Sequence, residues 1–497
     1  MSNPIALVRS ENAGEKPPKA NWFLGIAGVG ILGAAYYIAV SIEDPIAALL
    51  WFFIAVIMVI VATYLIFVAG SVVLCRILQK NKRYYYKANH FISVSSMTYR
   101  MKRNGAGLAS ICILLTMVLV MLSSTTALFI GVEDSLHARY PRDIILYMTM
   151  QKGEYVQEDT VSEYKDKVQE ILDEHDAQPE NVCDYRYGYS EGVMSDGIFA
   201  HDVWALQTFG FDTYSDVVQL YLVPIDDYNQ IMGADETLAE DEVLIFVLRM
   251  EYTEDTFQIA GGPEYRIKAQ VDDWIDNGRS NMSILPSLVV IVPNYEAAVA
   301  PLDQQAVVSH IWYYGFDLDL SADAQNEAYQ QIRGTDWIRG LEDADRIYHA
   351  SLESLEFNRE EFYGVYGGLF FLGILLSIVF LAAAVLIIYY KQISEGYEDQ
   401  ARFGIMRKVG MTKRDIRKSI NSQMLTVFFL PLLTAGVHLC FAFPMIQKML
   451  LLFNLTDIAL LITTTVVCFL IFGLLYALVY KITSNIYFSI VSGAKED

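Results

Sequence analysis

Six long runs of apolar residues alternate with polar stretches along the chain. Each run is about as long as the roughly 20 residues that an α-helix needs to cross a bilayer core. None contains Asp, Glu, Lys or Arg, whose insertion at mid-membrane costs about 2.5–3.5 kcal/mol per residue. The one titratable side chain in these runs, His438, can be accommodated there in its neutral form. The pattern predicts six membrane-spanning helices, over Trp22–Val40, Leu49–Leu74, Leu108–Ile130, Gly367–Tyr390, Met424–Met445 and Ile458–Val479.

The polar stretch between the third and fourth spans is long enough for a domain. Helical spacing of apolar residues predicts helices over Glu158–Gln178 and Ala322–Arg333. Short β-prone runs between turn residues predict strands over Val243–Leu248, Leu288–Val292 and Ile311–Leu320. The predicted fold class is therefore a polytopic α-helical membrane protein with six transmembrane helices and a large extracellular α+β domain.

The segment Asp343–Phe362 is helix-prone and is expected to run straight into the fourth span. Such a helix would form a stalk through which the external domain pushes on the membrane helix. A plain linker helix explains the same composition equally well.

Charge separates the chain into two populations. Residues 133–361 hold 47 acidic and 14 basic residues, whereas the rest holds 11 acidic and 22 basic residues. The loops Cys75–Ala106 and Lys391–Ile420 each hold eight bases, which predicts a cytoplasmic position, while the link Ser41–Pro45 is acidic. Orientation from basic loops therefore predicts that the acidic domain lies outside and that both termini are cytoplasmic.

These patterns together divide the chain into nine segments. The predicted order is a cytoplasmic N-terminal segment (1–21), two linking transmembrane helices (22–74), a basic cytoplasmic loop with an interfacial helix (75–106), the third transmembrane helix (107–131), the acidic extracellular domain (132–361), the fourth helix (362–390), cytoplasmic coupling helices (391–423), the fifth and sixth helices (424–480) and a cytoplasmic tail (481–497).

The sequence contains no convincing motif for nucleotide binding, metal binding or ion-driven transport. The glycines at 28, 30 and 33 match a dinucleotide-binding spacing, but they lie inside an apolar helix with no preceding strand. There is no phosphate-binding G-x-x-x-x-G-K-[ST] motif and no H-x-x-x-H pair, and Asp173–Asp176 reads as a solvated helix end. Uncharged spans argue against an ion-driven transporter. We therefore predict no catalytic, cofactor-binding or metal-binding residue, and no enzymatic activity in this chain.

Cysteine usage also limits the fold. Of five cysteines only Cys183 lies in the external domain, so that domain can form no intramolecular disulfide. This usage suits a Gram-positive cell surface.

The segment Tyr397–Gln423 is the most informative of the loops. It predicts two short helices joined at a sharp corner, with Gly410 as the stop signal and Thr412 as the cap of the second helix. A rigid corner with an apolar and basic face suits a membrane protein that takes force from a cytoplasmic partner. An interfacial elbow on anionic lipid is the alternative.

A family resemblance favours the first interpretation. The stretch Glu395–Ile416, followed by Gln423 and Phe428–Leu432, resembles the coupling region of FtsX-like ABC transporter permeases, and more narrowly their bacitracin-export (BceB-type) branch. A basic interfacial helix around Val94, Met97 and Met101 resembles the one that opens each such permease unit. The resemblance implies that the residues contacting the ATPase are Glu398, Asp399, Phe403, Met406, Arg407, Val409, Gly410 and Thr412.

The resemblance also implies partners. They are a cognate ABC ATPase dimer, a neighbouring membrane histidine kinase, a cationic peptide antibiotic or its lipid complex, and membrane lipids; nucleic acid is not among them. The implied function is the permease of an antimicrobial-peptide resistance and sensing complex. The alternative is a non-transporting FtsX-like signal transducer that regulates a cell-wall hydrolase, and an external cationic peptide ligand would discriminate the two.

The resemblance leaves one departure and one open question. Permeases of this branch have ten spans, so the chain looks N-terminally truncated by four spans, and either a late gene start, a broken gene or a second chain would account for that. The net charge of the acidic domain favours cationic ligands, or serves solubility alone. Tyr185, Tyr187 and Tyr189 are candidate ligand contacts if they are exposed, whereas tyrosines at alternate positions also fit one face of a core strand.

Overall fold

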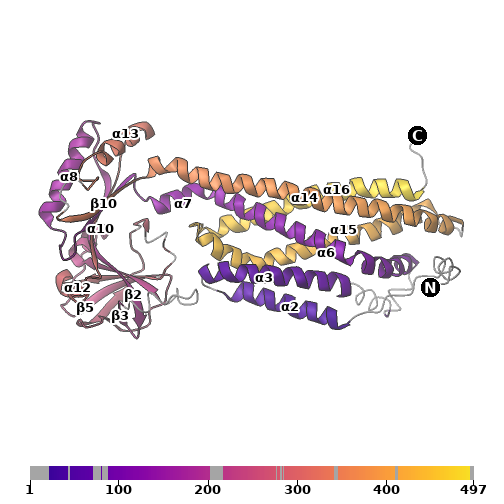
Figure 1. The fold of residues 1–497 in the computed structure, drawn as a ribbon, viewed down its shortest axis with the longest axis horizontal. Helices are drawn as coiled ribbons and strands as arrows, with labels where there is room; N and C mark the ends of the chain where they lie inside the picture. The colour runs from indigo at the N-terminus through magenta and orange to yellow at the C-terminus, as the bar shows by residue number, and fades with distance from the viewer. Residues whose placement is uncertain are drawn as a thin grey trace, which may run out of the picture.

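The protein is elongated, with a group of long helices at one end and a β-sheet domain at the other (Figure 1). The computed structural model describes residues 22–42, 45–70, 80, 88–201, 217–275, 277–279, 283, 285–340, 345–408 and 412–492. Six helices in these ranges are long and apolar enough to cross a membrane. The chain is therefore a multi-pass membrane protein, and the six predicted spans are confirmed.

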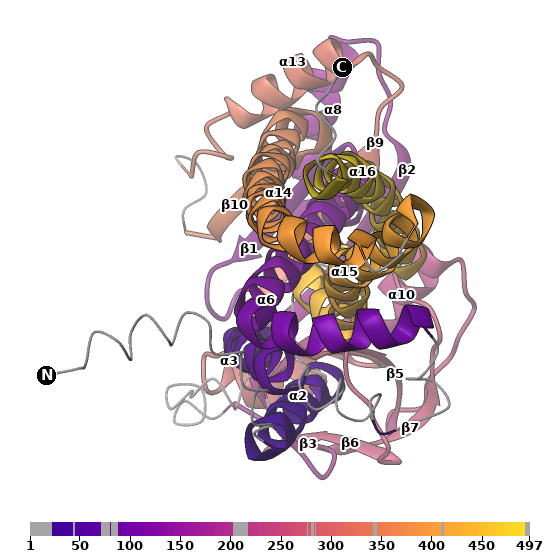
Figure 2. The same ribbon diagram turned by 90° about the vertical axis from the view of Figure 1, so that its right-hand side faces the viewer.

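The helices of the membrane part extend beyond the predicted spans. They are α2 (Trp22–Ser41), α3 (Pro45–Leu65) with a π-helical continuation η1 (Ile66–Gly70), α6 (Ala88–Ile130), α14 (Leu355–Lys408), α15 (Lys413–Leu451) and α16 (Ile458–Ser492). The predicted interfacial helix around Met97 is continuous with the third span in α6. Figure 2 looks along the bundle from the end away from the sheet and shows the start of α6 lying across the ends of the other helices.

Four of these helices share one apolar core. Leu115 of α6, Ala384 of α14, Phe428 of α15 and Tyr476 of α16 are all buried in it. Helices α2 and α3 form an antiparallel pair, here called the α2–α3 hairpin, which packs beside this core through a much smaller cluster of alanines and Met445. The described membrane part therefore consists of a four-helix core and a hairpin beside it, with Phe67 of η1, which continues α3, buried in the same core.

In its described residues the sheet domain contains ten strands and five helices. The strands are β1 (Ile144–Met150), β2 (Glu180–Ser195), β3 (Ile198–Ala200), β4 (Val217–Pro224), β5 (Glu242–Leu248), β6 (Thr256–Ile259), β7 (Glu264–Gln270), β8 (Ser287–Val292), β9 (Ser309–Asp317) and β10 (Ile347–Ser354). The helices are α7 (Val132–Arg139), α8 (Glu158–Asp173), α10 (Ile225–Met232), α12 (Tyr295–Asp303) and α13 (Ala322–Arg333). A mixed α and β composition confirms the predicted fold class.

The sheet closes on part of itself. Its order is β10-β1-β9-β2-β3-β6-β7-β5-β8-β4, and β4 returns to pair with β2. Seven strands therefore form a ring, from which β9, β1 and β10 extend as an open arm. Helices α8 and α13 cover one face of this arm through a core that includes Tyr164, Trp312 and Tyr329. The last strand of the arm, β10, leads directly into α14 (Figure 1).

The prediction of one continuous helix over Asp343–Phe362 is wrong in its first half. Residues Ile347–Ser354 form β10, which pairs antiparallel with β1, and α14 begins only at Leu355. The hydrogen bond from the Leu355 amide to the Asp143 carbonyl (2.9 Å) ends the ladder, and the Ser354 hydroxyl accepts from the Phe357 amide (3.3 Å). A distant strand thus overrides the local helix propensity.

Candidate functional site

The sheet is joined to the membrane helices at a compact junction. Helix α7 follows α6 after Gly131, and α14 follows β10, so both connections meet at one place. Arg139 at the end of α7 donates two hydrogen bonds to the carboxylate of Glu353 on β10, with N–O distances of 2.6 and 2.8 Å. Arg279 donates a further bond to Glu353 over 3.1 Å. The carboxylate of Glu353 therefore ties α7 to the strand that continues into α14.

Burial and neighbouring charges have opposite effects on the pKa of Glu353. Burial alone would raise the pKa of Glu353, but the hydrogen bonds from Arg139 and the charges of Arg139 and Arg279 outweigh it and lower that pKa below its ordinary value. The side chains of Glu353 and Arg139 are 12% and 20% exposed. This junction pair is well shielded from solvent, so salt screens it less than it screens a surface pair.

A second pair lies on the membrane side of the junction. Glu133 of α7 forms an ion pair with Arg359 of α14 and accepts a hydrogen bond from the Tyr363 hydroxyl (2.8 Å). Between the two pairs, Leu136 and Leu355 are buried with Tyr140 in a small apolar cluster. Ion pairs on both sides of a buried apolar contact make the junction a stiff connection.

The opposite end of α14 is also anchored. Asp399 is buried and accepts a hydrogen bond from the buried hydroxyl of Tyr487 on α16. Gly396, one turn earlier, lies against the same ring, where a Cβ would be 3.4 Å from Tyr487. The ring of Phe488 on α16 lies 5.2 Å from the guanidinium of Arg417 on α15. The last part of α16 therefore holds the ends of α14 and α15 that lie away from the sheet.

The structure separates the residues that the resemblance assigned to the ATPase contact. The side chains of Glu398 and Thr412 are exposed, whereas those of Asp399 and Phe403 are buried against the bundle. Of the others, Met406 and Arg407 lie in the last turns of α14, with backbone positions alone described, and Val409 and Gly410 fall outside the described residues.

The two helices predicted around the corner are not separate short elements. The first is the end of α14, which is 54 residues long, and the second is the start of α15, which is 39 residues long. The helical periodicity of Tyr397–Gln423 is a local signal. It did not indicate that both helices continue without a break from the spans and pack on α16.

The tyrosines that were candidate ligand contacts belong to the core of the sheet. Tyr185 and Tyr187 are buried on β2, where both rings pack in one aromatic cluster with Tyr313 of β9. Tyr189 is half-buried and donates a hydrogen bond to Glu191. The core-strand interpretation is therefore confirmed, and the idea of an exposed tyrosine surface is wrong.

Sequence reasoning missed the partners of these anchors. Tyr487 lies in the segment predicted as a tail, and Arg139 and Glu353 lie 214 positions apart. One local signal was available: Glu395 and Asp399 are four residues apart, so they share a helix face, and both are buried. No group of three or more His, Cys, Asp or Glu in the described part of the chain is arranged to hold a metal ion.

Comparison with known proteins gives one family match and several distant relatives. Residues 374–490 match the model of the FtsX-like permease C-terminal region. The chain is 22% identical to the ABC transporter permease protein YxdM of Bacillus subtilis over 96% of this chain and 70% of that protein. It is 23% identical to the bacitracin export permease protein BceB of Halalkalibacterium halodurans over 77% of this chain and 55% of that protein. The matched region runs from the middle of α14 to near the end of α16, so it contains the anchored end described above.

Proposed function

We propose that this chain is an ABC transporter permease of the FtsX-like family, which the match over residues 374–490 supports. In this proposal it couples ATP hydrolysis to antimicrobial-peptide resistance and sensing at the cell membrane. The ATP is hydrolysed by a separate ATPase dimer. The chain spans 70% and 55% of the two relatives described above. A membrane histidine kinase is a neighbour in this proposal.

One observation carries the proposal: α14 is unbroken from the sheet to the anchored end. Its 54 residues correspond to a length of about 80 Å, since an α-helix rises about 1.5 Å per residue. One end is tied to the sheet domain through β10 and the junction pairs, and the other carries Glu398 close to the corner. A displacement of the corner therefore reaches the sheet domain along one rigid element.

Exposure separates two roles among the predicted coupling residues. Glu398 and Thr412 are exposed, so we assign them to the proposed ATPase-docking surface together with Met406, Arg407, Val409 and Gly410. Asp399 and Phe403 fix the direction of α14 relative to α16 instead. The docking surface is thus presented by a helix end whose orientation is set by buried contacts.

The acidic sheet domain is the proposed receiver of the peptide. With both termini cytoplasmic, as the basic loops predict, the domain lies outside the cell. Its 47 acidic and 14 basic residues within 133–361 attract cationic peptides, or their lipid complexes, over long range. Two of the relatives are named bacitracin export permeases, which supports a peptide of that kind.

The coupling half of the proposal is tested by charge reversal at an exposed position. Glu398→Arg should weaken co-purification of the cognate ATPase and lower resistance, because it reverses charge on the docking surface. The matched control is Glu360→Arg, the same change at an exposed position near the other end of α14. If Glu398→Arg and the control retain the ATPase and the resistance equally, the docking surface is misassigned.

A non-transporting signal transducer remains the second candidate. The unbroken α14 favours it equally, since motion of the sheet domain alone could activate an external hydrolase. Calorimetry with a cationic cell-wall-active peptide and the full chain in nanodiscs discriminates the two. Binding that weakens as salt rises supports the peptide-resistance permease, because charge attraction is screened beyond about 8 Å at physiological salt. Absence of any binding, with or without the lipid carrier, favours the transducer.

A further inference from the structure

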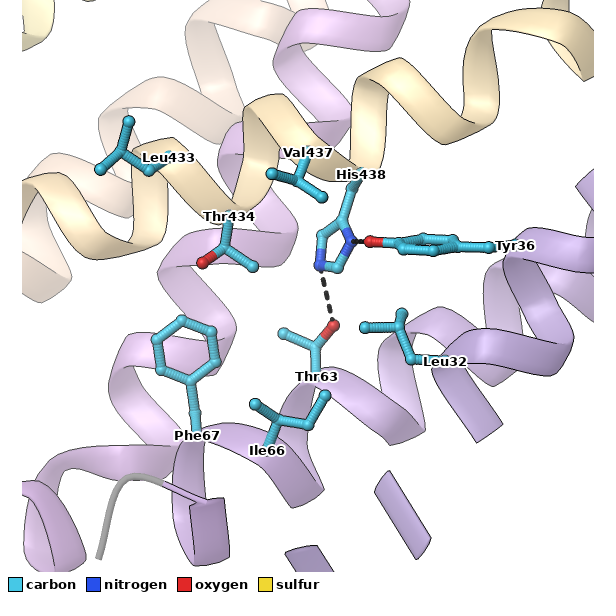
Figure 3. A pocket seen from close by; sticks show the side chains of 9 residues that line it. All are labelled: Leu32, Tyr36, Thr63, Ile66, Phe67, Leu433, Thr434, Val437 and His438. Carbon is cyan, nitrogen blue, oxygen red and sulfur yellow. Dashed lines mark hydrogen bonds between the residues drawn. The ribbon is translucent and has the colours of Figure 1, made fainter. Parts of the chain in front are cut away.

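A histidine inside the membrane part joins three helices. His438 of α15 is buried, with 4% of its surface exposed. Its Nδ1 lies 2.6 Å from the hydroxyl of Tyr36 on α2, and its Nε2 lies 3.1 Å from the hydroxyl of Thr63 on α3 (Figure 3). Both ring nitrogens are therefore engaged, and each bonds a different helix of the α2–α3 hairpin.

The partners define which nitrogen carries the proton. The Thr63 hydroxyl donates its one hydrogen to the Val59 carbonyl over 2.6 Å, so towards the imidazole it acts as an acceptor. Nε2 must then carry the hydrogen that Thr63 accepts. This leaves the lone pair of Nδ1 to accept from the Tyr36 hydroxyl, so the arrangement is satisfied by a neutral ring protonated on Nε2.

Two apolar pockets lie beside this group. They measure about 290 and 350 Å³, are partly open to the surface of the bundle, and both have Tyr36 and His438 in their walls. On one side, the ring of Tyr36 stacks on that of Phe441 with 4.0 Å between the centroids. Because a bilayer supplies no hydrophobic force between helices, close packing and hydrogen bonds decide where a span docks. Beside the packing of the alanines on Met445, the two hydrogen bonds of His438 are polar contacts that join both helices of the hairpin to α15.

Helix α15 contains one proline on each side of His438. Pro431 and Pro444 lie inside α15, and each removes a backbone hydrogen bond and favours bending. A second contact ties the hairpin to the same helix, because Lys448 donates a hydrogen bond to the Ile42 carbonyl. Both of these contacts are made by the part of α15 that follows Pro431, whereas a third, between the hydroxyls of Tyr64 on α3 and Ser110 on α6 (2.8 Å), joins the hairpin to the core.

We propose that His438 is a positioning residue that fastens the α2–α3 hairpin to α15 through Tyr36 and Thr63, so that the hairpin follows α15 as one body. The inference rests on the arrangement of the spans and not on the proposed function. It holds whether the protein exports a peptide or only transmits a signal.

Distances between spin labels in the full chain test this role. The chain is placed in nanodiscs with its cysteines replaced, and labels are attached at Ser41 of the hairpin and Val365 of α14, both exposed. His438→Leu should raise the population of displaced hairpin by about eightfold, since both interhelical hydrogen bonds of the imidazole are lost. His438→Gln should restore the original distribution, because its amide offers both an acceptor and a donor.

A control pair and a spectroscopic measurement separate positioning from general damage. Labels at Val365 and Ile458 report on the four-helix core, and their distances should not change in His438→Leu. Nitrogen-15 spectra of labelled histidines should show a neutral ring protonated on Nε2 whose signals are lost in His438→Gln. An unchanged Ser41–Val365 distribution in His438→Leu, equal broadening in the core pair, or a ring protonated on Nδ1 each overturns the proposal.

Discussion

The junction carboxylate Glu353 offers the sharpest test of how the sheet domain is held to the helices. Glu353→Gln removes the negative charge that faces Arg139 and Arg279 while keeping the size of the side chain. Breaking a fully buried pair costs about 3–5 kcal/mol and losing an exposed pair costs about 0–1 kcal/mol. With 12% and 20% exposure the main pair lies between these limits, and the contact of Arg279, 43% exposed, adds little. We expect a local loss of about 2 kcal/mol.

Amide hydrogen exchange measures this loss where it occurs. A cost of about 2 kcal/mol corresponds to roughly 30-fold faster exchange, which we expect for the amides of β10 and β1 and not for the ring of the sheet. The control is Glu236→Gln, which removes the carboxylate of the more exposed pair with Lys268. Unchanged exchange in β10 would refute the junction as a stiff connection.

The same carboxylate gives the junction a pH dependence. The pKa of Glu353 is lower in the folded protein than in the unfolded chain, because the two arginines favour its charged form despite burial. Its stabilising contribution is therefore complete above the ordinary glutamate pKa of about 4.3 and is lost as the pH falls through the lower folded value. The protection of the β10 amides, relative to the intrinsic exchange rate at each pH, should fall in that acidic range in the wild-type protein, and in Glu353→Gln this contribution to the fall should be absent.

Three further predictions concern the membrane part. A Cβ at Gly373 would collide with a threonine side chain of α6, so Gly373→Ala should lower the melting temperature in detergent, whereas Gly368→Ala, with open space around it, should not. Tyr487→Phe should destabilise the anchored end of α14 by about 1–3 kcal/mol, because it leaves a buried carboxylate without its hydroxyl donor, and exchange of the last turns of α14 measures this. Cysteines placed at the exposed positions Thr237 and Ser394 should be labelled from opposite sides of the membrane, Thr237 from outside; labelling from one side would contradict the orientation.

Features encoded within one stretch of sequence were predictable. The six spans follow from apolar length alone, since a bilayer excludes charged side chains whatever the fold. Helix α13 was predicted with its bounds, Ala322–Arg333, because both ends are marked locally: the Ser321 hydroxyl accepts from the Ala324 amide (3.5 Å), and Gly334 follows the last turn. Such signals act within a few residues, so no tertiary contact is needed to interpret them.

Features that depend on distant partners were not predictable. Residues 347–354 form a strand because β1, about 200 positions earlier, offers a ladder. The buried state of Asp399 depends on Tyr487, and the tie between Arg139 and Glu353 depends on the closure of a whole domain. For the candidate site, the sequence predicted helices on both sides of residues 409–411, and its assignment of coupling residues to their ends stays a prediction. It did not predict which of their faces are buried.

Helices α14 and α15 differ in proline content, and this difference gives them different bending properties. Helix α14 contains no proline in its 54 residues and is anchored at both ends, and the adjacent Gly367 and Gly368 are where it bends most easily. Helix α15 contains Pro431 and Pro444, and between them it carries His438, which holds the α2–α3 hairpin. In the proposed coupling to an ATPase, a push on the adjoining ends of α14 and α15 has two routes: along α14 to the sheet domain, and along α15 to the hairpin as a bend. Because the routes part at the corner, disabling the His438 contacts should displace the hairpin without disturbing β10, and weakening the Glu353 contacts should do the reverse.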